Sequence, residues 1–388
     1  MSRGATVPAA PIGLYVHVPF CKTRCPYCAF YFVVGRKSAR DPYVGALLDE
    51  IDRSARDPRF TRPVASIYFG GGTPSLFAPE VIARILERIR ARFAVASDAE
   101  VSLEANPDGL ERGYLDGILE CGVNRLTLGW QSLRDAHLKA LGRTHRAGEI
   151  PRSLADARAA GFANVGVDLI FGLPNQTASS WTDEVTRAAE LGPDHVSAYE
   201  LTFEEGTRLT RDRDVGRFVP PDEDERAEMF EGVERVLAAA GIARYEISNF
   251  ARAGHECRHN LAGWRGGDLL GVGASAASHV ANARWTNVAD LDEYVRRVRT
   301  GASQVEAVET LDDELWAAEE LYLGLRTTEG VDAGTRLAPL AAPSRARLAR
   351  VLDDACERGL AARVGSRVTL TARGRLLADS VFEELLVR

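Results

Sequence analysis

The 388-residue sequence lacks long hydrophobic runs, an excess of positive charge and abundant cysteine. No stretch reaches the roughly eighteen consecutive apolar residues that a membrane-spanning helix requires. Residues 1–12 lack the apolar core of a signal peptide. A net charge of −7 leaves no domain-wide basic field to hold phosphates. With only six cysteines, the chain fits a reducing compartment. We therefore expect a soluble, cytoplasmic protein without a transmembrane segment or a nucleic-acid partner.

Two common nucleotide-binding motifs are also missing. Residues 70–74, Gly-Gly-Gly-Thr-Pro, lie between a predicted strand and a predicted helix. They lack the Gly-Lys-Ser/Thr ending of a phosphate loop and the G-x-G-x-x-G spacing of a dinucleotide fold. A glycine triplet by itself is more often a tight turn than a binding site. Consecutive glycines do, however, let backbone amides approach a ligand and form an anion-binding concavity.

Three of the six cysteines, Cys21, Cys25 and Cys28, fall within eight residues with C-x3-C-x2-C spacing. A structural zinc site normally uses four ligands in two separated pairs, and a disulfide framework suits such a cysteine-poor chain less well. His17 alternates along a predicted strand at 13–20, so strand geometry places it. Three thiolates are one ligand short of closing a four-iron cluster. We predict a [4Fe–4S] cluster with one iron open to a small-molecule ligand.

This spacing, with Tyr27 just before the third cysteine, resembles the radical S-adenosylmethionine (SAM) superfamily. In that superfamily the amino and carboxylate groups of SAM chelate the open iron. The resemblance implies that the glycine segment is a cradle for the SAM amino group.

Strand-like and helix-like patterns alternate about six times between residues 13 and 201, in units of about 30 residues. This alternation predicts an α/β fold with a parallel sheet, helices outside, and functional residues beyond the carboxyl ends of the strands. We predict a partial (β/α)6 TIM-like barrel with a C-terminal winged-helix-like α+β module. The expected divisions are a leader at 1–12, the barrel at 13–205, an extension at 206–309 and the module at 310–388.

Polar side chains interrupt the apolar strand patterns. Glu104, Gln131 and Asp168 lie at the ends or in the middle of predicted strands, and Arg143 is a cation that could pair with any of them. A carboxylate on an apolar strand usually needs a cationic or hydrogen-bonding partner. For any one residue a structural hydrogen bond is as good an explanation as ligand contact. Together they favour a polar ligand such as SAM.

The segment 257–264 is predicted to be a polar-aromatic loop. A loop histidine such as His259 is usually exposed or makes one backbone hydrogen bond. The functional alternative is an axial iron ligand, with Trp264 as a flat neighbour for a macrocycle. Cys257 is then either a second ligand or a packing residue.

Together these residues resemble the HemN/HemW subfamily of radical SAM proteins over nearly the whole chain. The resemblance implies that Cys21, Cys25 and Cys28 hold the cluster. It also implies a set of SAM contacts: Tyr15, Gly71, Gly72, Thr73, Glu104, Gln131, Arg143 and Asp168.

Within the subfamily, two features favour the HemW branch. Coproporphyrinogen dehydrogenases carry a longer N-terminal segment and a further cysteine where this chain has Phe30. HemW-like proteins carry an H-N-x-x-Y-W motif, which His259 to Trp264 match except for Gly263 in place of tyrosine. A second departure is Ala29, where HemW proteins commonly have Asp. The resemblance implies a haem chaperone that binds a [4Fe–4S] cluster, SAM and haem and delivers haem to an apo-haemoprotein; a homodimer is one assembly that it allows.

The alternative is a radical SAM enzyme, in which reductive cleavage of SAM yields a 5′-deoxyadenosyl radical. Its reaction would be either oxidative decarboxylation of coproporphyrinogen III or radical methylation. Phe30 and the nearly complete haem motif count against the first reaction. An iron–sulfur electron carrier is a third alternative, but it would not need Glu104, Gln131 and Asp168.

Overall fold

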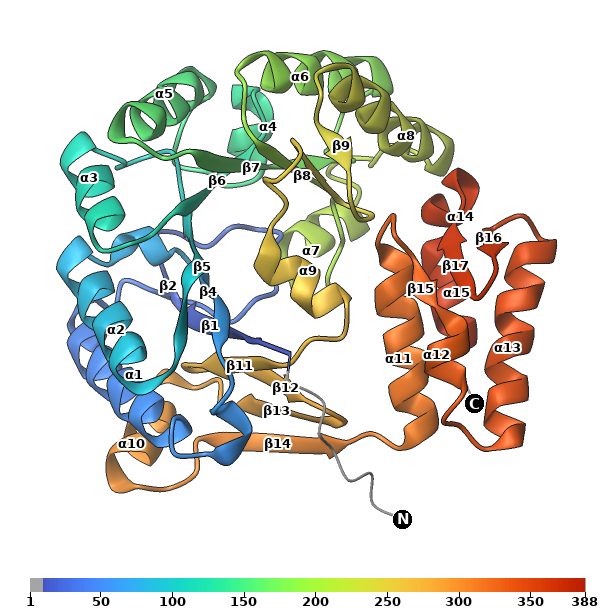
Figure 1. Ribbon diagram of the computed structural model, residues 1–388. Coiled ribbons are helices and arrows are strands. Elements are labelled where there is room, and N and C mark those ends of the chain that lie inside the picture. Colours follow the sequence, from blue (N-terminus) through green and yellow to red (C-terminus); the bar gives the residue numbers. More distant parts are fainter. Residues whose placement is uncertain (1–9, 388) are drawn as a thin grey trace.

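The computed structural model describes residues 10–387, and its main feature is a curved twelve-stranded sheet (Figure 1). Seven neighbouring strands are parallel. In sheet order these strands are β11 (Leu269–Val272), β1 (Ile12–Val18), β4 (Val64–Gly71), β5 (Val95–Ala105), β6 (Arg125–Gln131), β7 (Asn164–Phe171) and β8 (His195–Glu200). The six from β1 to β8 are those of the predicted partial barrel, so the α/β class and the (β/α)6 core are confirmed.

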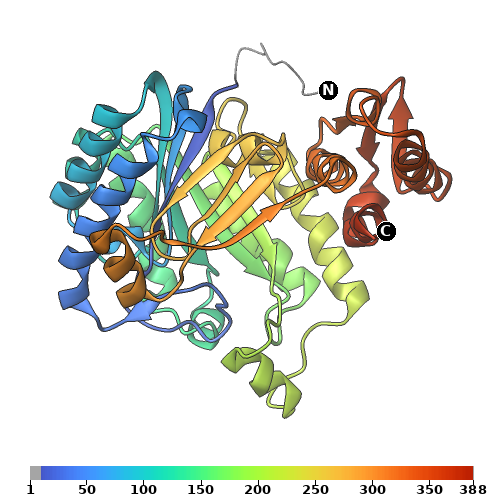
Figure 2. The same ribbon diagram turned by 90° about the horizontal axis from the view of Figure 1, so that it is seen from below.

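Helices cover the outer face of this sheet (Figures 1 and 2). They are α1 (Arg40–Ser54), α2 (Pro79–Arg92), α3 (Arg112–Glu120), α4 (Asp135–Ala140), α5 (Ile150–Ala160), α6 (Ala178–Glu190) and α8 (Glu223–Ala239). Strand β1 illustrates the division between the two faces, because successive side chains of a strand point to opposite sides. Leu14, Val16 and Val18 are fully buried in the core under the helices, whereas Tyr15 and His17 point to the inside of the barrel.

Antiparallel strands extend both edges of the parallel sheet. Beyond β11 lie β12 (Ala277–Val280), β13 (Ala283–Asn287) and β14 (Val305–Thr310); beyond β8 lie β10 (Asn249–Ala251) and β9 (Ala243–Arg244). The strand–helix alternation recognised in the sequence ends at residue 201 and does not predict β11 beside β1. Gly271 lets β11 and β12 approach closely, since a Cβ there would lie 2.2 Å from the carbonyl oxygen of Ala277.

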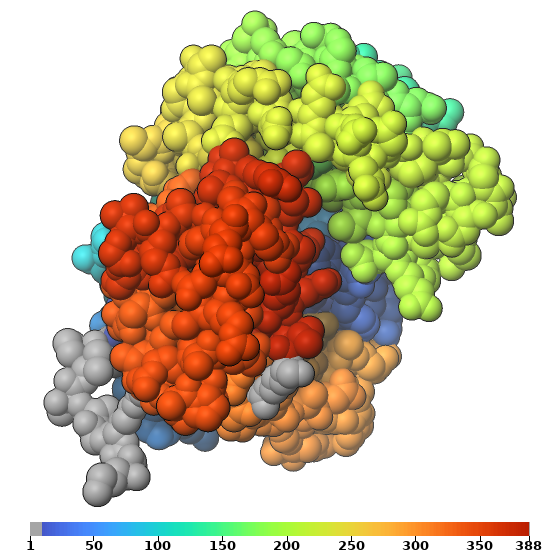
Figure 3. Space-filling view, turned by 90° about the vertical axis from the view of Figure 1, so that its right-hand side faces the viewer, coloured from blue at the N-terminus to red at the C-terminus, as the bar shows by residue number. Residues whose placement is uncertain are grey.

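The C-terminal residues form a lobe with its own hydrophobic core at the side of the barrel (Figures 2 and 3). Its elements are α11 (Asp313–Arg326), β15 (Val331–Asp332), α12 (Ala333–Leu337), α13 (Ala342–Glu357), β16 (Ala361–Val364), β17 (Arg367–Leu370), α14 (Ala372–Leu376) and α15 (Ala378–Leu386). The strands form a small antiparallel sheet in the order β15-β17-β16. The last two helices, α14 and α15, are separated by a break at Leu377.

The remaining elements are short segments that connect the strands and helices described above. They are β2 (Phe20–Cys21), β3 (Val33–Val34), α7 (Arg208–Asp214), α9 (Arg258–Trp264), α10 (Leu291–Thr300) and four short 3-10 turns at Lys37–Ala39, Pro58–Phe60, Pro74–Leu76 and Ala147–Glu149. Helix α7 lies in the segment that follows β8. In this segment Phe203 and Leu209 pack against Tyr27 of the cysteine loop. Across residues 10–387, no helix has the length and apolar character needed to cross a membrane.

Candidate functional site

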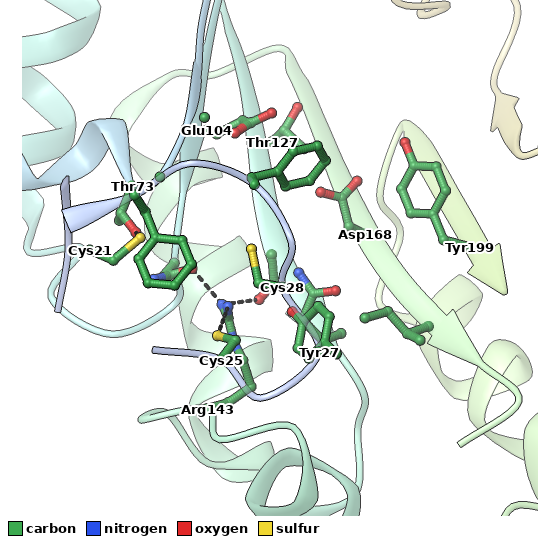
Figure 4. Close-up of a pocket in the computed structure, with 18 of the residues that line it drawn as sticks. Cys21, Cys25, Tyr27, Cys28, Thr73, Glu104, Thr127, Arg143, Asp168 and Tyr199 are labelled. Carbon is green, nitrogen blue, oxygen red and sulfur yellow. Dashed lines mark hydrogen bonds between the residues drawn. The ribbon is translucent and has the colours of Figure 1, made fainter. Parts of the chain in front are cut away.

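A cavity of about 850 Å³ lies at the carboxyl ends of the parallel strands, beneath the cysteine loop (Figure 4). Ten of the twelve predicted site residues line it: Cys21, Cys25, Cys28, Gly71, Gly72, Thr73, Glu104, Gln131, Arg143 and Asp168. The other two, Tyr15 and His259, are not in its lining. The fold therefore brings residues from β4 to β7 and from the loop after β1 to one place, as expected for parallel strands that end at the same edge.

The cysteine loop presents three free, partly buried thiols to this cavity. The Cys28 amide donates to the Cys25 carbonyl (3.3 Å) and curls the loop. Two polar side chains approach the sulfurs: Thr73 Oγ1 lies 3.8 Å from Cys21 Sγ, and Arg143 Nη1 lies 3.9 Å from Cys25 Sγ. Burial raises the pKa of Cys21 to about 11. Metal ligation requires the thiolate, so metal binding at this thiol would release a proton.

This donor set fits an iron–sulfur cluster better than a single ion. Nowhere within residues 10–387 do three or more His, Cys, Asp or Glu side chains converge closely enough to hold one metal ion. A four-iron cluster accepts thiolates at separate corners, and three protein cysteines leave one iron for another ligand. The alternative of a closed zinc site has no fourth ligand here, because His17 hydrogen-bonds Tyr15 (3.0 Å) inside the barrel.

The glycine segment after β4 is shaped by its neighbours. Gly71 adopts a φ of +109°, and a Cβ there would lie 2.5 Å from the His17 ring. The amides of Gly72 and Thr73 donate to the carbonyls of Val18 and Phe20 (2.8 Å each). These amides fasten the cysteine loop to β4, so they are not free to form an anion-binding concavity.

Glu104 and Asp168 face the cavity from β5 and β7 (Figure 4). The Tyr68 hydroxyl donates to Glu104 Oε1 (2.8 Å). Burial raises the pKa of Glu104 to about 7 and also raises that of Asp168, whose side chain is hydrogen-bonded by Ser197. Perturbed carboxylates in a cleft are typical of functional sites.

The expected ion pair between Arg143 and one of these carboxylates is not formed within the described part of the chain. The guanidinium instead donates to the Gly129 carbonyl (2.9 Å) and to the side chain of Asn106. Both bonds come from Nη2, and Nη1 lies toward Cys25. Arg143 therefore brings positive charge to the cysteine loop and leaves the carboxylates to other partners.

Gln131 ends β6 in the left-handed region, with φ of +65°. The register with β7 shifts between Leu128 and Gln131, which marks a local irregularity at the strand end. Glutamine rarely adopts this conformation, and such strain is concentrated at binding sites. The sequence carried no sign of it.

Tyr15 and His259 lie behind the cavity wall. Tyr15 stacks on Tyr68 with ring centroids 6.3 Å apart. His259 belongs to helix α9, so the prediction of a loop at 257–264 is wrong. Glu100 accepts hydrogen bonds from the amides of Arg258 (3.0 Å) and His259 (3.1 Å), and this carboxylate at the start of the helix explains the difference.

His259 is buried at the floor of the barrel, not exposed. Its Nδ1 is hydrogen-bonded to Ser66 Oγ (2.9 Å), and its ring stacks on Tyr68 at 5.1 Å. Burial lowers the pKa of His259 to about 4. Cys257, also fully buried, places its Sγ 3.6 Å from Glu100 Oε1.

The sequence analysis missed several residues that line the cavity: Tyr68, Asn106, Arg125, Thr127, Ser197 and Tyr199. Strand alternation could have found some of them. Tyr68 lies two residues before Gly70 on the inward face of β4, and Thr127 pairs with Glu104 across β5 and β6. Hydroxyl-bearing residues are common on ordinary strands, so only their place on the same inward face as Glu104 marks them as cavity residues.

Residues 15–187 match the family model described as the radical SAM superfamily. The chain is 39% identical over 386 residues to the heme chaperone HemW of Mycobacterium tuberculosis, covering 98% of this chain and 96% of that protein. It is 34% identical over 376 residues to the heme chaperone HemW of Bacillus subtilis, covering 96% and 98%. Among solved structures, it resembles the Escherichia coli radical SAM enzyme coproporphyrinogen III oxidase (HemN), with a TM-score of 0.83, 27% identity, and coverage of 98% and 91%.

Proposed function

Because the chain belongs to the HemW family of radical SAM proteins, we propose that it is a haem chaperone that delivers haem to an apo-haemoprotein. As a radical SAM protein it takes a [4Fe–4S] cluster and SAM as cofactors, which supply an electron-transfer centre and an iron open to SAM. Haem is the cargo in this proposal. The cytoplasmic location, the identity of the acceptor and homodimer formation stay predictions.

In this proposal Cys21, Cys25 and Cys28 hold the cluster. Arg143 places positive charge 3.9 Å from Cys25 Sγ. Thr73 donates a hydrogen bond to Cys21 Sγ (3.8 Å), which lowers the pKa of Cys21 and so opposes the effect of its burial. Both groups reduce the cost of keeping thiolates in a partly buried loop.

SAM would lie beside the cysteine loop, in the cavity lined by Glu104, Gln131 and Asp168. The two carboxylates can accept hydrogen bonds from ribose hydroxyls or face the positive sulfonium. Because the amides of Gly72 and Thr73 are already occupied, the segment would meet the SAM ammonium with carbonyl oxygens. An ammonium needs acceptors, so this arrangement suits the amino group better than an anion site would.

The observation that carries the haem assignment is the environment of His259. Its Nδ1 is held by Ser66, and its Nε2 has no hydrogen-bond partner among residues 10–387. Metal-ligating histidines are typically held in this way, with one ring nitrogen oriented by a partner and the other left for the metal. The lowered pKa keeps the imidazole neutral, as a ligand must be.

The departure at Gly263 does not disrupt this environment. Gly263 is exposed, and a Cβ at this position would meet no heavy atom within 4 Å. A tyrosine here would project into open space rather than fill the barrel floor. Trp264 is covered instead by Arg326 of the C-terminal lobe, whose guanidinium lies 4.3 Å from the centre of the indole ring.

A radical SAM enzyme is the second candidate, favoured by the structural similarity to coproporphyrinogen III oxidase and by the size of the cavity. Phe30, in place of the further cysteine, is 76% exposed at the edge of the cavity and offers no thiol there. Formation of 5′-deoxyadenosine from SAM under reducing conditions distinguishes the two functions, because haem carriage does not require it.

The test is a haem titration of the anaerobically reconstituted protein, followed by the Soret band. We expect stoichiometric binding to the wild type, loss in His259→Ala, and retention in His255→Ala, a matched histidine in the loop just before α9. Cluster absorbance and iron content should be lost in Cys25→Ser and kept in Cys121→Ser. Rapid formation of 5′-deoxyadenosine without haem uptake by the wild type would refute the chaperone function.

A further inference from the structure

Four aromatic rings form a column through the inside of the barrel, from beneath the cysteine loop to its floor. His17 and Tyr15 have ring centroids 5.8 Å apart, Tyr15 and Tyr68 6.3 Å, and Tyr68 and His259 5.1 Å. The last two contacts are stacked, with interplanar angles of 24° and 29°. The column runs beside the cavity proposed to hold SAM, and Tyr68 is part of the cavity's lining.

Tyr68 is the member of this column that touches both proposed sites. Its hydroxyl donates to Glu104 Oε1 (2.8 Å), and it lines the cavity itself. The face of its ring lies on the imidazole of His259. Burial beside Glu104 holds the pKa of Tyr68 well above its ordinary value, so the hydroxyl remains a donor.

Two glycines make room for this arrangement. A Cβ at Gly70 would lie 2.9 Å from the Tyr68 ring, 3.0 Å from the Tyr15 ring and 3.2 Å from Glu104 Oε1. A Cβ at Gly13 would lie 3.3 Å from the His259 ring. The column is therefore tightly packed, so the displacement of one ring requires its neighbours to move as well.

We propose that Tyr68 couples the two sites, so that SAM bound at Glu104 weakens haem binding at His259. The proposal rests on the function proposed above and names a residue through which SAM would control haem. Tyr68 acts through its neighbours, so it is a positioning residue.

The sign of the coupling follows from the burial of His259. His259 is 9% exposed, its Nδ1 edge lies against Ser66 and Gly13, and one face of its ring lies on Tyr68. A macrocycle as large as haem therefore gains room beside the imidazole only if the ring separates from Tyr68. SAM in the cavity would immobilise Glu104 and, through the hydroxyl bond, Tyr68. A fixed Tyr68 makes this separation more costly, and linkage requires haem to weaken SAM binding by the same factor.

The experiment measures haem affinity with and without saturating SAM, and SAM affinity with and without haem, on the reconstituted full chain. In the wild type we expect each ligand to weaken the other about tenfold, within the usual range of coupling. Tyr68→Phe keeps the ring but removes the bond to Glu104, so the factor by which each ligand weakens the other should fall below about twofold.

Tyr294→Phe is the matched control. It removes a buried tyrosine–glutamate hydrogen bond of the same kind, from Tyr294 to Glu50, away from both sites. The tenfold coupling should survive there even if stability falls. Amide hydrogen exchange in the wild type is a second measurement that needs no variant: SAM should slow exchange over Arg258–Trp264.

The outcomes separate the two claims. Three results would each overturn the role of Tyr68. They are coupling that persists in Tyr68→Phe, coupling that is absent or positive in the wild type, and coupling without protection of α9 from exchange. In each case haem binding that depends on His259 leaves the proposed function standing. A wild type that binds no haem would overturn the proposed function and the coupling together.

Discussion

Replacing Glu104 by glutamine should stabilise this protein at alkaline pH. Glu104 is half-buried in the lining of the cavity, and desolvation there raises its pKa from 4.5 to about 7. Between these values the folded protein binds a proton that the unfolded chain has lost, so stability falls as pH rises. Glutamine has nearly the same shape, carries no charge, and keeps an oxygen to accept the Tyr68 hydroxyl.

The size of the effect follows from the shift. A difference of about 2.5 pKa units at about 1.36 kcal/mol per unit is about 3 kcal/mol, present in full above pH 7 and absent below pH 4.5. For a chain of 388 residues this corresponds to about 4 °C in the unfolding midpoint. Glu104→Gln should therefore melt about 4 °C above the wild type at pH 8 and close to it at pH 5.

The assay is thermal unfolding of the SAM-free chain at both pH values. A Glu104→Gln midpoint that differs from the wild type by the same amount at pH 5 and pH 8 would refute the reasoning, since the ionised carboxylate would then carry no cost. Glu100→Gln is the control of opposite sign. Glu100 accepts from the amides of Arg258 and His259, so its loss should destabilise the protein at both pH values by about 1–3 kcal/mol.

Three further predictions concern the loop, the lobe and the histidine. Gly71 has a φ of +109° and lies against the His17 ring, so Gly71→Ala should lower the free energy of unfolding by at least about 2 kcal/mol and reduce cluster content. Gly113→Ala, at an exposed position of α3, should be neutral or stabilising by up to about 1 kcal/mol. Similar losses of stability in both variants would contradict this. Arg326→Ala removes the cation that lies 3.2 Å from the buried carboxylate of Glu246. The C-terminal lobe should then be destabilised by about 3 kcal/mol, and the chain between β14 and α11 should be cleaved faster by a protease. An unchanged rate of proteolysis would contradict this prediction. Haem affinity should be constant from pH 6 to 8, because the pKa of His259 is lowered to about 4; a decline toward pH 6 would indicate an ordinary, exposed histidine.

Local patterns in the sequence were enough for the barrel and for most of the cavity lining. Six strand–helix units follow from periodicity, because each strand buries one face under its own helix. The three cysteines are adjacent in sequence, so their convergence on one loop needs no tertiary information. Glu104, Gln131 and Asp168 meet because parallel strands end at a common edge, a rule that holds for any such sheet.

Local sequence patterns did not predict the contacts between segments that are far apart in the chain. Strand β11 returns from residue 269 to pair with β1, and Glu100 begins a helix 158 residues further along the chain. The amides of Gly72 and Thr73 are taken by carbonyls of the cysteine loop, which the glycine triplet itself does not reveal.

The sequence by itself determined which chemical groups the site contains and at which strand ends they lie. The tertiary structure alone decided how these groups are paired. It turned Arg143 to Cys25 rather than to a carboxylate, and it buried His259 against Tyr68 rather than leaving it exposed. The physical reason is that partners within one element follow from helix and strand periods, whereas partners across the barrel depend on packing among segments that the sequence does not order in space.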